Sequence, residues 1–194
     1  MKKVNCIIFD CDGTLVDSEP LTNNVIAEMA GELGIKMTGE EATSLWGGKT
    51  IDAVVYGMKE MSGKDLPEDW VSRLVQNVSN AYKYDLVPMD GIAEVLDSLK
   101  IAGLYKYFQG KVYTASEVKY PKPAPDLFLY AVDKMGFSNE ECVIIEDSIP
   151  GITAAVRAGI RVLGLVKMSS KKEIVEAGAE PFTNMRELPS LLGL

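Results

Sequence analysis

Four acidic residues fall into two short groups, and each group directly follows an apolar run. Asp10 and Asp12 follow the first run, and Glu146 and Asp147 follow a run much later in the chain. Carboxylates brought close together repel each other unless a cation lies between them. Oxygen ligands of this kind suit Mg²⁺, which proteins usually hold with one or two carboxylates and a substrate phosphate. The two groups therefore indicate a magnesium site, if the fold brings them together.

The same side chains are suited to phosphoryl transfer. Asp10 can attack phosphorus to form an aspartyl-phosphate, and Asp12, two residues along, can protonate the leaving oxygen and then activate water. Lys122 would neutralise charge on the phosphoryl group. The chain has no histidine, which excludes histidine-based triads, histidine-ligated zinc and histidine general bases.

Each of these features also has a purely structural explanation. An Asp-x-Asp pair is common in proteins, Glu146-Asp147-Ser148 can cap a following helix, and a lone lysine such as Lys122 is usually a solvated surface charge. A structural α/β domain, however, has no need for aspartate at the ends of two separate apolar strands. The joint placement therefore favours a site.

Strands and helices are expected to alternate over most of the chain. We predict strands at Val4–Phe9, 111–114, Cys142–Ile145 and Arg161–Leu165, and helices at 91–100, 124–135 and 149–158. This alternation is typical of an α/β fold in which helices cover both faces of a parallel sheet. Ligands of such sheets bind beyond the carboxyl ends of the strands, where the acidic groups and Lys122 are expected to converge.

A helical segment interrupts this alternation. Ser18 is a plausible N-cap for a helix that runs to about Leu33, and Trp70, Leu74, Val78 and Tyr82 form a second stripe at helical spacing. We therefore expect an all-helical insert at 18–86 and an α/β core made of 1–17 and 87–194.

The overall composition narrows the function classes. With 194 residues and a net charge of −8, the chain is not expected to bind nucleic acid or other polyanions. No apolar segment is long enough to cross a bilayer, so no membrane partner is expected. Three cysteines without metal spacing in an acidic chain favour a reduced, cytoplasmic protein. A monomer is the default expectation.

Three motifs resemble those of the haloacid dehalogenase superfamily, in the same order. They are the stretch from Asp10 to Glu19, which reads Asp-Cys-Asp-Gly-Thr-Leu-Val-Asp-Ser-Glu; Lys122-Pro123-Ala124-Pro125-Asp126; and Glu146-Asp147-Ser148 followed by Gly151-Ile152. The nearest branch is that of β-phosphoglucomutase and small sugar phosphatases. The resemblance implies a Rossmann-like core with an inserted helical cap, Asp10 as nucleophile and Asp12 as acid/base. It also implies Mg²⁺ held by Asp10, the Asp12 carbonyl and Asp147, with Glu146 nearby, and a small phosphorylated substrate such as a sugar phosphate.

The second motif of that superfamily, a Ser or Thr at the end of a strand, has no counterpart. It should lie between Lys100 and Gly103, where only Ile101 and Ala102 stand. About 25 residues are absent by typical element lengths. Three explanations stay open: an omitted stretch, a tolerated deletion, or an inactive binding protein. Thr114 and Ser116 are candidate substrate-binding substitutes for the hydroxyl.

Another departure bears on the type of reaction. Enzymes of the mutase branch carry a histidine twelve residues after the nucleophile, and Thr22 stands there. This favours a phosphatase over a β-phosphoglucomutase-like isomerase.

Gly47-Gly48-Lys49-Thr50 partly matches a phosphate-binding P-loop. The motif requires glycine at position 43, which is Thr43, and a preceding strand, whereas the preceding segment reads as a helix. A turn between helices with Thr50 as N-cap explains the segment. The alternative is a cap loop that places Lys49 over the substrate, as the family's specificity loop does.

Overall fold

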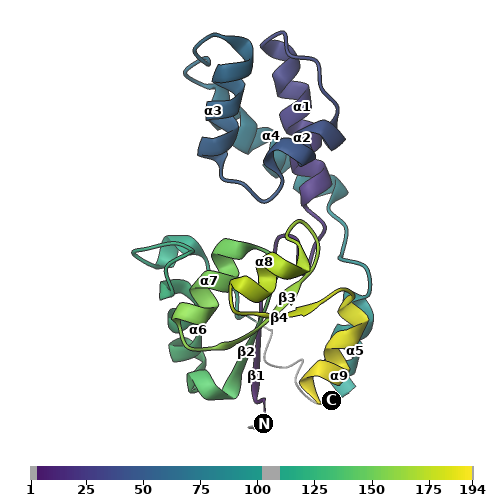
Figure 1. The fold of residues 1–194 in the computed structure, drawn as a ribbon, viewed down its shortest axis with the longest axis vertical. Coiled ribbons are helices and arrows are strands. Elements are labelled where there is room, and N and C mark those ends of the chain that lie inside the picture. Colours follow the sequence, from purple (N-terminus) through teal and green to yellow (C-terminus); the bar gives the residue numbers. More distant parts are fainter. Residues whose placement is uncertain (1–3, 102–109, 194) are drawn as a thin grey trace. The chain divides into compact units, whose positions relative to one another are not determined.

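The computed structural model describes residues 4–101 and 110–193. The chain forms two compact units, one made of Met1–Leu15 with Pro88–Leu194 and the other of Val16–Val87. The first unit contains a sheet covered by helices, and the second contains helices alone (Figure 1).

A four-stranded parallel sheet is the centre of the first unit. Its strands are β1 (Cys6–Phe9), β2 (Cys142–Glu146), β3 (Arg161–Leu165) and β4 (Glu180–Phe182), and they lie in that order. Ile8 pairs with Ile144, and Ile145 pairs with Leu163. Within the described residues, β1 and β4 are therefore the two edges of the sheet.

Helices cover both faces of this sheet. The helices of the first unit are α5 (Ile92–Ile101), α6 (Asp126–Met135), α7 (Ile149–Arg157), α8 (Lys171–Glu176) and α9 (Leu188–Leu192), with short 3-10 turns at Ala115–Glu117, Asn139–Glu141 and Met185–Glu187. Side chains of β2 alternate between two buried clusters: Ile144 packs with α6, α7 and α8, and Ile145 packs with α5 and α9. The predicted α/β class is confirmed.

The strand predicted at 111–114 is wrong. Residues 111–114 form no ladder with any described strand, and Val112 is 81% exposed. The β-branched and aromatic residues there suit a strand, but this preference depends on a neighbouring strand to pack against. Instead, the segment leads into a turn in which the Glu117 carboxylate accepts a hydrogen bond of 2.6 Å from the Thr114 backbone.

The expected position of the second motif lies outside the described residues. Ile101 is the last residue of α5, and the segment that begins at Ala102 is not described as far as Gln109. Within the described parts of the chain, no strand flanks β1 on the side away from β2.

The second unit has its own core. Its helices are α1 (Glu19–Glu32), α2 (Gly39–Trp46), α3 (Ile51–Ser62) and α4 (Trp70–Asp85). Each helix contributes to one buried cluster, which includes Met29, Trp46, Met58 and Trp70. Thr50 caps α3 by accepting a hydrogen bond from the Ala53 amide, so the capping prediction for Thr50 is confirmed.

Backbone hydrogen bonds pair the two segments at the division between the units. Asp17 donates to the Val87 carbonyl at 2.9 Å, and Met89 donates to the Leu15 carbonyl at 2.9 Å. The segments on either side of residues 16–87 are thus tied together in the manner of a short two-stranded ladder.

No helix within the described ranges combines the length and the apolar character needed to cross a bilayer.

Candidate active site

The ends of β1 and β2 bring the two acidic groups together. Phe9 pairs with Ile145, and the Asp10 amide donates to the Ile145 carbonyl at 2.9 Å. Asp10, Glu146 and Asp147 each place a carboxylate oxygen within 4.8 Å of the others. Residues separated by more than 130 positions in the chain thus share one site, because parallel strands end at the same edge of the sheet.

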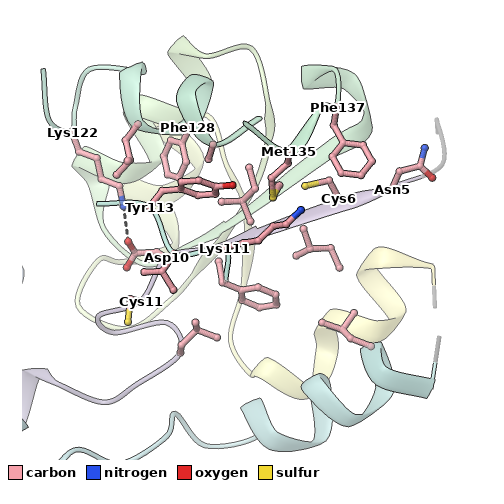
Figure 2. Close-up of a pocket in the computed structure, with 18 residues that line it drawn as sticks. Asn5, Cys6, Asp10, Cys11, Lys111, Tyr113, Lys122, Phe128, Met135 and Phe137 are labelled. Carbon is pink, nitrogen blue, oxygen red and sulfur yellow. Dashed lines mark hydrogen bonds and ion pairs between the residues drawn. The ribbon is translucent and has the colours of Figure 1, made fainter. Parts of the chain in front are cut away.

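Lys122 lies between two of these carboxylates. Its Nζ lies 2.5 Å from Asp10 Oδ1 and 2.6 Å from Glu146 Oε1, and Figure 2 shows the lysine reaching across to Asp10. Burial opposes the ammonium charge, but the negative charges of Glu146 and Asp10 outweigh it and raise the pKa of Lys122. The lysine therefore carries its positive charge at neutral pH.

Glu146 is fully buried and held by many donors. Its Oε2 accepts hydrogen bonds from the amides of Asp147 and Ser148 and from the Ser148 hydroxyl, at 2.7 to 2.9 Å. Burial raises the pKa of Glu146, and the charge of Lys122 opposes this shift. A carboxylate has about four lone-pair sites. Glu146 Oε1, which accepts a hydrogen bond from Lys122, can therefore still accept a further donor or bind a metal ion.

The carboxylate of Glu146 also depends on the absence of a side chain at residue 151. A Cβ at Gly151 would lie 1.6 Å from Glu146 Oε1. Only glycine leaves room for the carboxylate beside the first turn of α7, and the amides at that end of a helix favour negative charge.

Asp147 lies against the turn that follows β1. A Cβ at Gly13 would lie 2.2 Å from Asp147 Oδ2, and Gly13 adopts a positive φ of 79° that suits glycine. The buried Thr14 hydroxyl donates to Asp147 Oδ1 at 3.5 Å. The turn after β1 is thus shaped to accept the Asp147 carboxylate.

The donors gathered here fit a magnesium ion. Three carboxylates converge with one lysine, and all of the candidate ligand atoms are oxygens, which Mg²⁺ prefers over nitrogen or sulfur. The missing side chain at Gly13 leaves room for the Asp147 carboxylate against the turn after β1. Asp12 is exposed, and its carboxylate is not part of the group; the family resemblance assigns a ligand role to its backbone carbonyl.

The three candidate substrate-binding residues, Thr114, Ser116 and Lys49, are not part of the carboxylate cluster. Thr114 and Ser116 are exposed and hydrogen-bond each other at 2.7 Å beside the 3-10 turn at Ala115–Glu117. Lys49 is exposed in the helical unit, in the turn between α2 and α3. The adjacent Gly48 amide donates to Glu19 Oε1 at 2.8 Å, so the carboxylate of α1 holds this turn.

A cavity of about 260 Å³ opens beside Asp10 and Lys122. It follows β1 from Asp10 to Asn5, with Phe128 and Met135 of α6 on one side (Figure 2). Most of its wall is apolar.

Several residues that shape the site received no role from the sequence. Thr14, Ser148, Gly13 and Gly151 lie within the motifs, and the first two donate hydrogen bonds to the acidic side chains. The sequence offered one indication of their roles, which is their closeness to the acidic residues. Gly13, Thr14 and Ser148 lie within two residues of Asp12 or Asp147, and Gly151 lies about one helical turn after Asp147. Their contacts depend on distances that spacing alone does not give.

Comparisons with known proteins identify the family of this chain. Sequence models described as haloacid dehalogenase-like hydrolase match residues 7–106 and 93–159. The chain belongs to the haloacid dehalogenase-like hydrolase family.

Relatives in this family are named as phosphatases of sugar phosphates and related acids. The 6-phosphogluconate phosphatase of Escherichia coli K12 is 24% identical over 211 residues, covering 98% of this chain and 96% of the relative. The fructose-1-phosphate phosphatase of the same organism is 32% identical over 177 residues, covering 79% and 92%. Among solved structures, a family hydrolase from Deinococcus radiodurans with bound phosphate and sodium superposes with a TM-score of 0.79 at 25% identity, covering 100% and 96%.

Proposed function

We propose that this protein is a magnesium-dependent phosphatase that hydrolyses a small phosphorylated metabolite, with a sugar phosphate as the favoured class. The observation that carries the proposal is the cluster of the Asp10, Glu146 and Asp147 carboxylates, with the Lys122 ammonium group paired to the first two. The names of the relatives support the substrate class.

Asp10 would attack the phosphorus in line, and the bond to the leaving oxygen would break as the Asp10–phosphorus bond forms. Asp12 would donate its proton to that oxygen and then take a proton from the water that hydrolyses the aspartyl-phosphate. Asp12 is exposed and has no ion pair among the described residues, which suits a group that must exchange protons.

Lys122 would hold one oxygen of Asp10 and neutralise negative charge on the phosphoryl group. Asp10, the Asp12 carbonyl and Asp147 would hold Mg²⁺, with Glu146 Oε1 beside them. When bound, Mg²⁺ supplies positive charge that offsets the charge of the phosphate oxygens. Residues 18–86 would act as a cap that excludes bulk water and selects the substrate through Lys49.

The surroundings of Thr22 favour hydrolysis over isomerisation. Its hydroxyl hydrogen-bonds Tyr82 at 2.7 Å and the Ser18 carbonyl at 3.1 Å. Thr22 is thus engaged within the helical unit and has no acid/base capacity near neutral pH. The competing mutase activity would show itself as retention of the phosphoryl group on the product.

The test is release of inorganic phosphate from a panel of sugar phosphates with Mg²⁺. Asp10→Asn keeps the shape of the side chain and removes the nucleophile, so the rate is expected to fall by at least about 10³-fold. Asp133→Asn, an exposed change on α6, is the matched control and is expected to keep the wild-type rate. Near wild-type activity in Asp10→Asn would remove Asp10 from its role, and binding of sugar phosphate by the wild type without turnover would favour an inactive binding protein.

Calcium offers a second check. Ca²⁺ coordinates oxygen at longer distances and with looser geometry than Mg²⁺, so replacing Mg²⁺ with Ca²⁺ is expected to lower the rate strongly. Equal rates with the two ions would contradict the proposed role of the metal.

A further inference from the structure

Two buried cysteines lie directly opposite each other at the start of β1 and β2. Cys6 is the first residue of β1, Cys142 is the first residue of β2, and the two are partners in the parallel register. Both side chains belong to the buried cluster under α6, α7 and α8, so they point to the same face of the sheet. The acidic site lies at the opposite ends of the same strands and uses neither cysteine.

The spacing of the two strands suits a disulfide between these residues. Neighbouring strands lie about 4.7–4.9 Å apart, and disulfides join residues whose Cα atoms are about 4.4–6.8 Å apart. The Cys6 thiol donates a hydrogen bond to the Cys142 sulfur, and the Cys142 thiol donates to the Ser138 carbonyl at 3.3 Å. Because the two sulfur atoms are in contact, a bond between them requires little movement of the backbone.

The third cysteine has no comparable partner. Cys11 is exposed and lies past the carboxyl end of β1, which ends at Phe9, three positions after Cys6. Figure 2 shows Cys6 and Cys11 far apart along the strand, and at the rise of a strand they are separated by about 10 Å or more. Cα atoms more than about 7 Å apart cannot be bridged without backbone movement. The register therefore selects Cys6 and Cys142 as the pair.

The hydrogen bond between the thiols also indicates which sulfur reacts first. This hydrogen bond, together with burial, raises the pKa of Cys6, and the same hydrogen bond lowers the pKa of Cys142. The thiolate is the nucleophile in thiol chemistry, so Cys142 is the better nucleophile and Cys6 keeps its proton. With only 6% of Cys6 and 3% of Cys142 exposed, the pair suits a small oxidant.

We propose that Cys6 and Cys142 form an oxidation site for small hydroperoxides, which convert the two thiols to a disulfide that joins β1 and β2. With hydrogen peroxide, the Cys142 thiolate attacks one oxygen, the O–O bond breaks, and Cys142 becomes a sulfenic acid. The departing hydroxide takes up the proton that Cys142 had lost. The Cys6 sulfur then attacks the Cys142 sulfur, and the sulfenic oxygen leaves as water with the Cys6 proton. Two thiols thus lose two electrons, and one hydrogen peroxide becomes two waters.

The residues that precede the two cysteines control entry of the oxidant. The Asn5 amide donates to the Glu141 carbonyl at 2.9 Å, and the Asn5 side chain donates to Glu141 Oε1 at 2.9 Å. Local opening at this end of the strands would expose the sulfur atoms. Asn5→Ala removes the side-chain hydrogen bond, so its disulfide is expected to form about fivefold faster.

The test is treatment of the full chain with hydrogen peroxide, followed by thiol counting in denaturant and peptide mapping without reductant. The reduced chain has three thiols, and Cys11 alone is expected to remain free after oxidation. Mapping is expected to find the Cys6 peptide joined to the Cys142 peptide, and dithiothreitol is expected to restore all three thiols. Since the disulfide closes a long loop, the Tm is expected to rise by about 5 °C or more.

Three substitutions separate the roles of the cysteines. Cys11→Ser changes an exposed residue and is the matched control, which is expected to form the cross-link as the wild type does. Cys6→Ala lacks the second thiol, so the Cys142 sulfenic acid is expected to persist and to react with dimedone. Cys142→Ala is expected to show little dimedone labelling at Cys6.

Three results would overturn the proposal: three free thiols after peroxide treatment, a cross-link that contains Cys11, or sulfinic acid at Cys142 without a disulfide. Mapping of the wild type gives this answer even if a variant at a buried cysteine fails to fold. None of the measurements depends on the release of phosphate, so the proposal stands or fails separately from the proposed function.

Discussion

The role that each residue of this site can take depends on its hydrogen-bond partners as well as on its residue type. Glu146 could serve as a ligand, a base or a cap by residue type alone. In the fold, three donors hold its Oε2 and Lys122 holds its Oε1. Glu146 therefore orients the Lys122 ammonium group in the fold.

Gly151 is the residue on which that arrangement depends most directly. In Gly151→Ala, the added Cβ would overlap the Glu146 carboxylate, so we expect a loss of about 1–3 kcal/mol in the free energy of unfolding and a lower rate of phosphate release. Urea denaturation measures the first effect.

Gly31→Ala is the matched control for this change. Gly31 is exposed within α1, and an added Cβ would meet nothing within 4 Å. Because alanine favours helix over glycine, the variant is expected to gain up to about 1 kcal/mol. Equal effects of the two substitutions would show that the Glu146 carboxylate moves aside without cost.

The ion pair of Lys122 predicts a pH dependence of stability. Burial opposes its charge, but Glu146 and Asp10 raise the pKa of Lys122 above its ordinary value of 10.5. A pKa that is higher in the folded than in the unfolded state means that the stabilisation is complete below the unfolded pKa and is lost as the pH rises through the folded pKa.

The measurement compares wild type with Lys122→Met by urea denaturation from about pH 8 to about pH 11. The difference in unfolding free energy is expected to be largest at the lower end and to shrink above the ordinary lysine pKa. A difference that stays constant over this range would contradict the ion-pair explanation.

At the scale of elements, the turn between α2 and α3 depends on a carboxylate from another helix. Glu19 Oε1 accepts a hydrogen bond from the Gly48 amide, next to Lys49. In Glu19→Ala, amide exchange at Gly48 is expected to become about fivefold faster, the factor that corresponds to one hydrogen bond of about 1 kcal/mol.

Glu19→Gln is the control, because its amide oxygen can still accept the hydrogen bond. It is expected to keep exchange at Gly48 close to that of wild type. If both variants exchange alike, the carboxylate does not hold the turn. If Lys49 binds substrate as proposed, KM rises in Glu19→Ala more than kcat falls.

The helices and strands also show which parts of the secondary structure could be predicted from the sequence. The strands predicted at Cys142–Ile145 and Arg161–Leu165 formed, at Cys142–Glu146 and Arg161–Leu165, because short apolar runs between helical segments specify buried parallel strands. The helices beside them were predictable from their apolar faces. Residues 111–114 were mispredicted because β-propensity needs a neighbouring strand, and they pair with none in the described ranges 4–101 and 110–193. The strand Glu180–Phe182 was missed because three residues that include Pro181 carry almost no periodic signal.

Within the candidate site, the identity of the acids could be read from motifs at strand ends, and that of Lys122 from the Lys122-Pro123 motif alone, since the strand predicted before it does not form. Their contacts could not. The hydrogen bonds of Thr14 and Ser148 arise only when two distant turns are packed together, and the spacing of residues in one segment carries no information about the other.

At the scale of the whole molecule, each unit encloses a separate core. Met58 is completely buried in the helical unit, and Ile144 is completely buried in the sheet unit. Met58→Ala is expected to cost about 2–5 kcal/mol in the helical unit and to speed amide exchange in α1–α4. Amide exchange in β2 is expected to change little, since Met58 and Ile144 belong to different buried clusters. Equal acceleration in both units would mean that they unfold as one.

The paired segments at Leu15–Asp17 and Val87–Met89 have an implication for engineering. Because the chain leaves and rejoins the sheet unit through backbone groups that bond each other, the intervening 72 positions from Val16 to Val87 form a module with adjacent ends. A helical insert from a different hydrolase, grafted between Leu15 and Pro88, would therefore leave Asp10, Glu146 and Asp147 of the sheet unit unchanged, and such a graft would test whether the helical unit selects the substrate, as proposed.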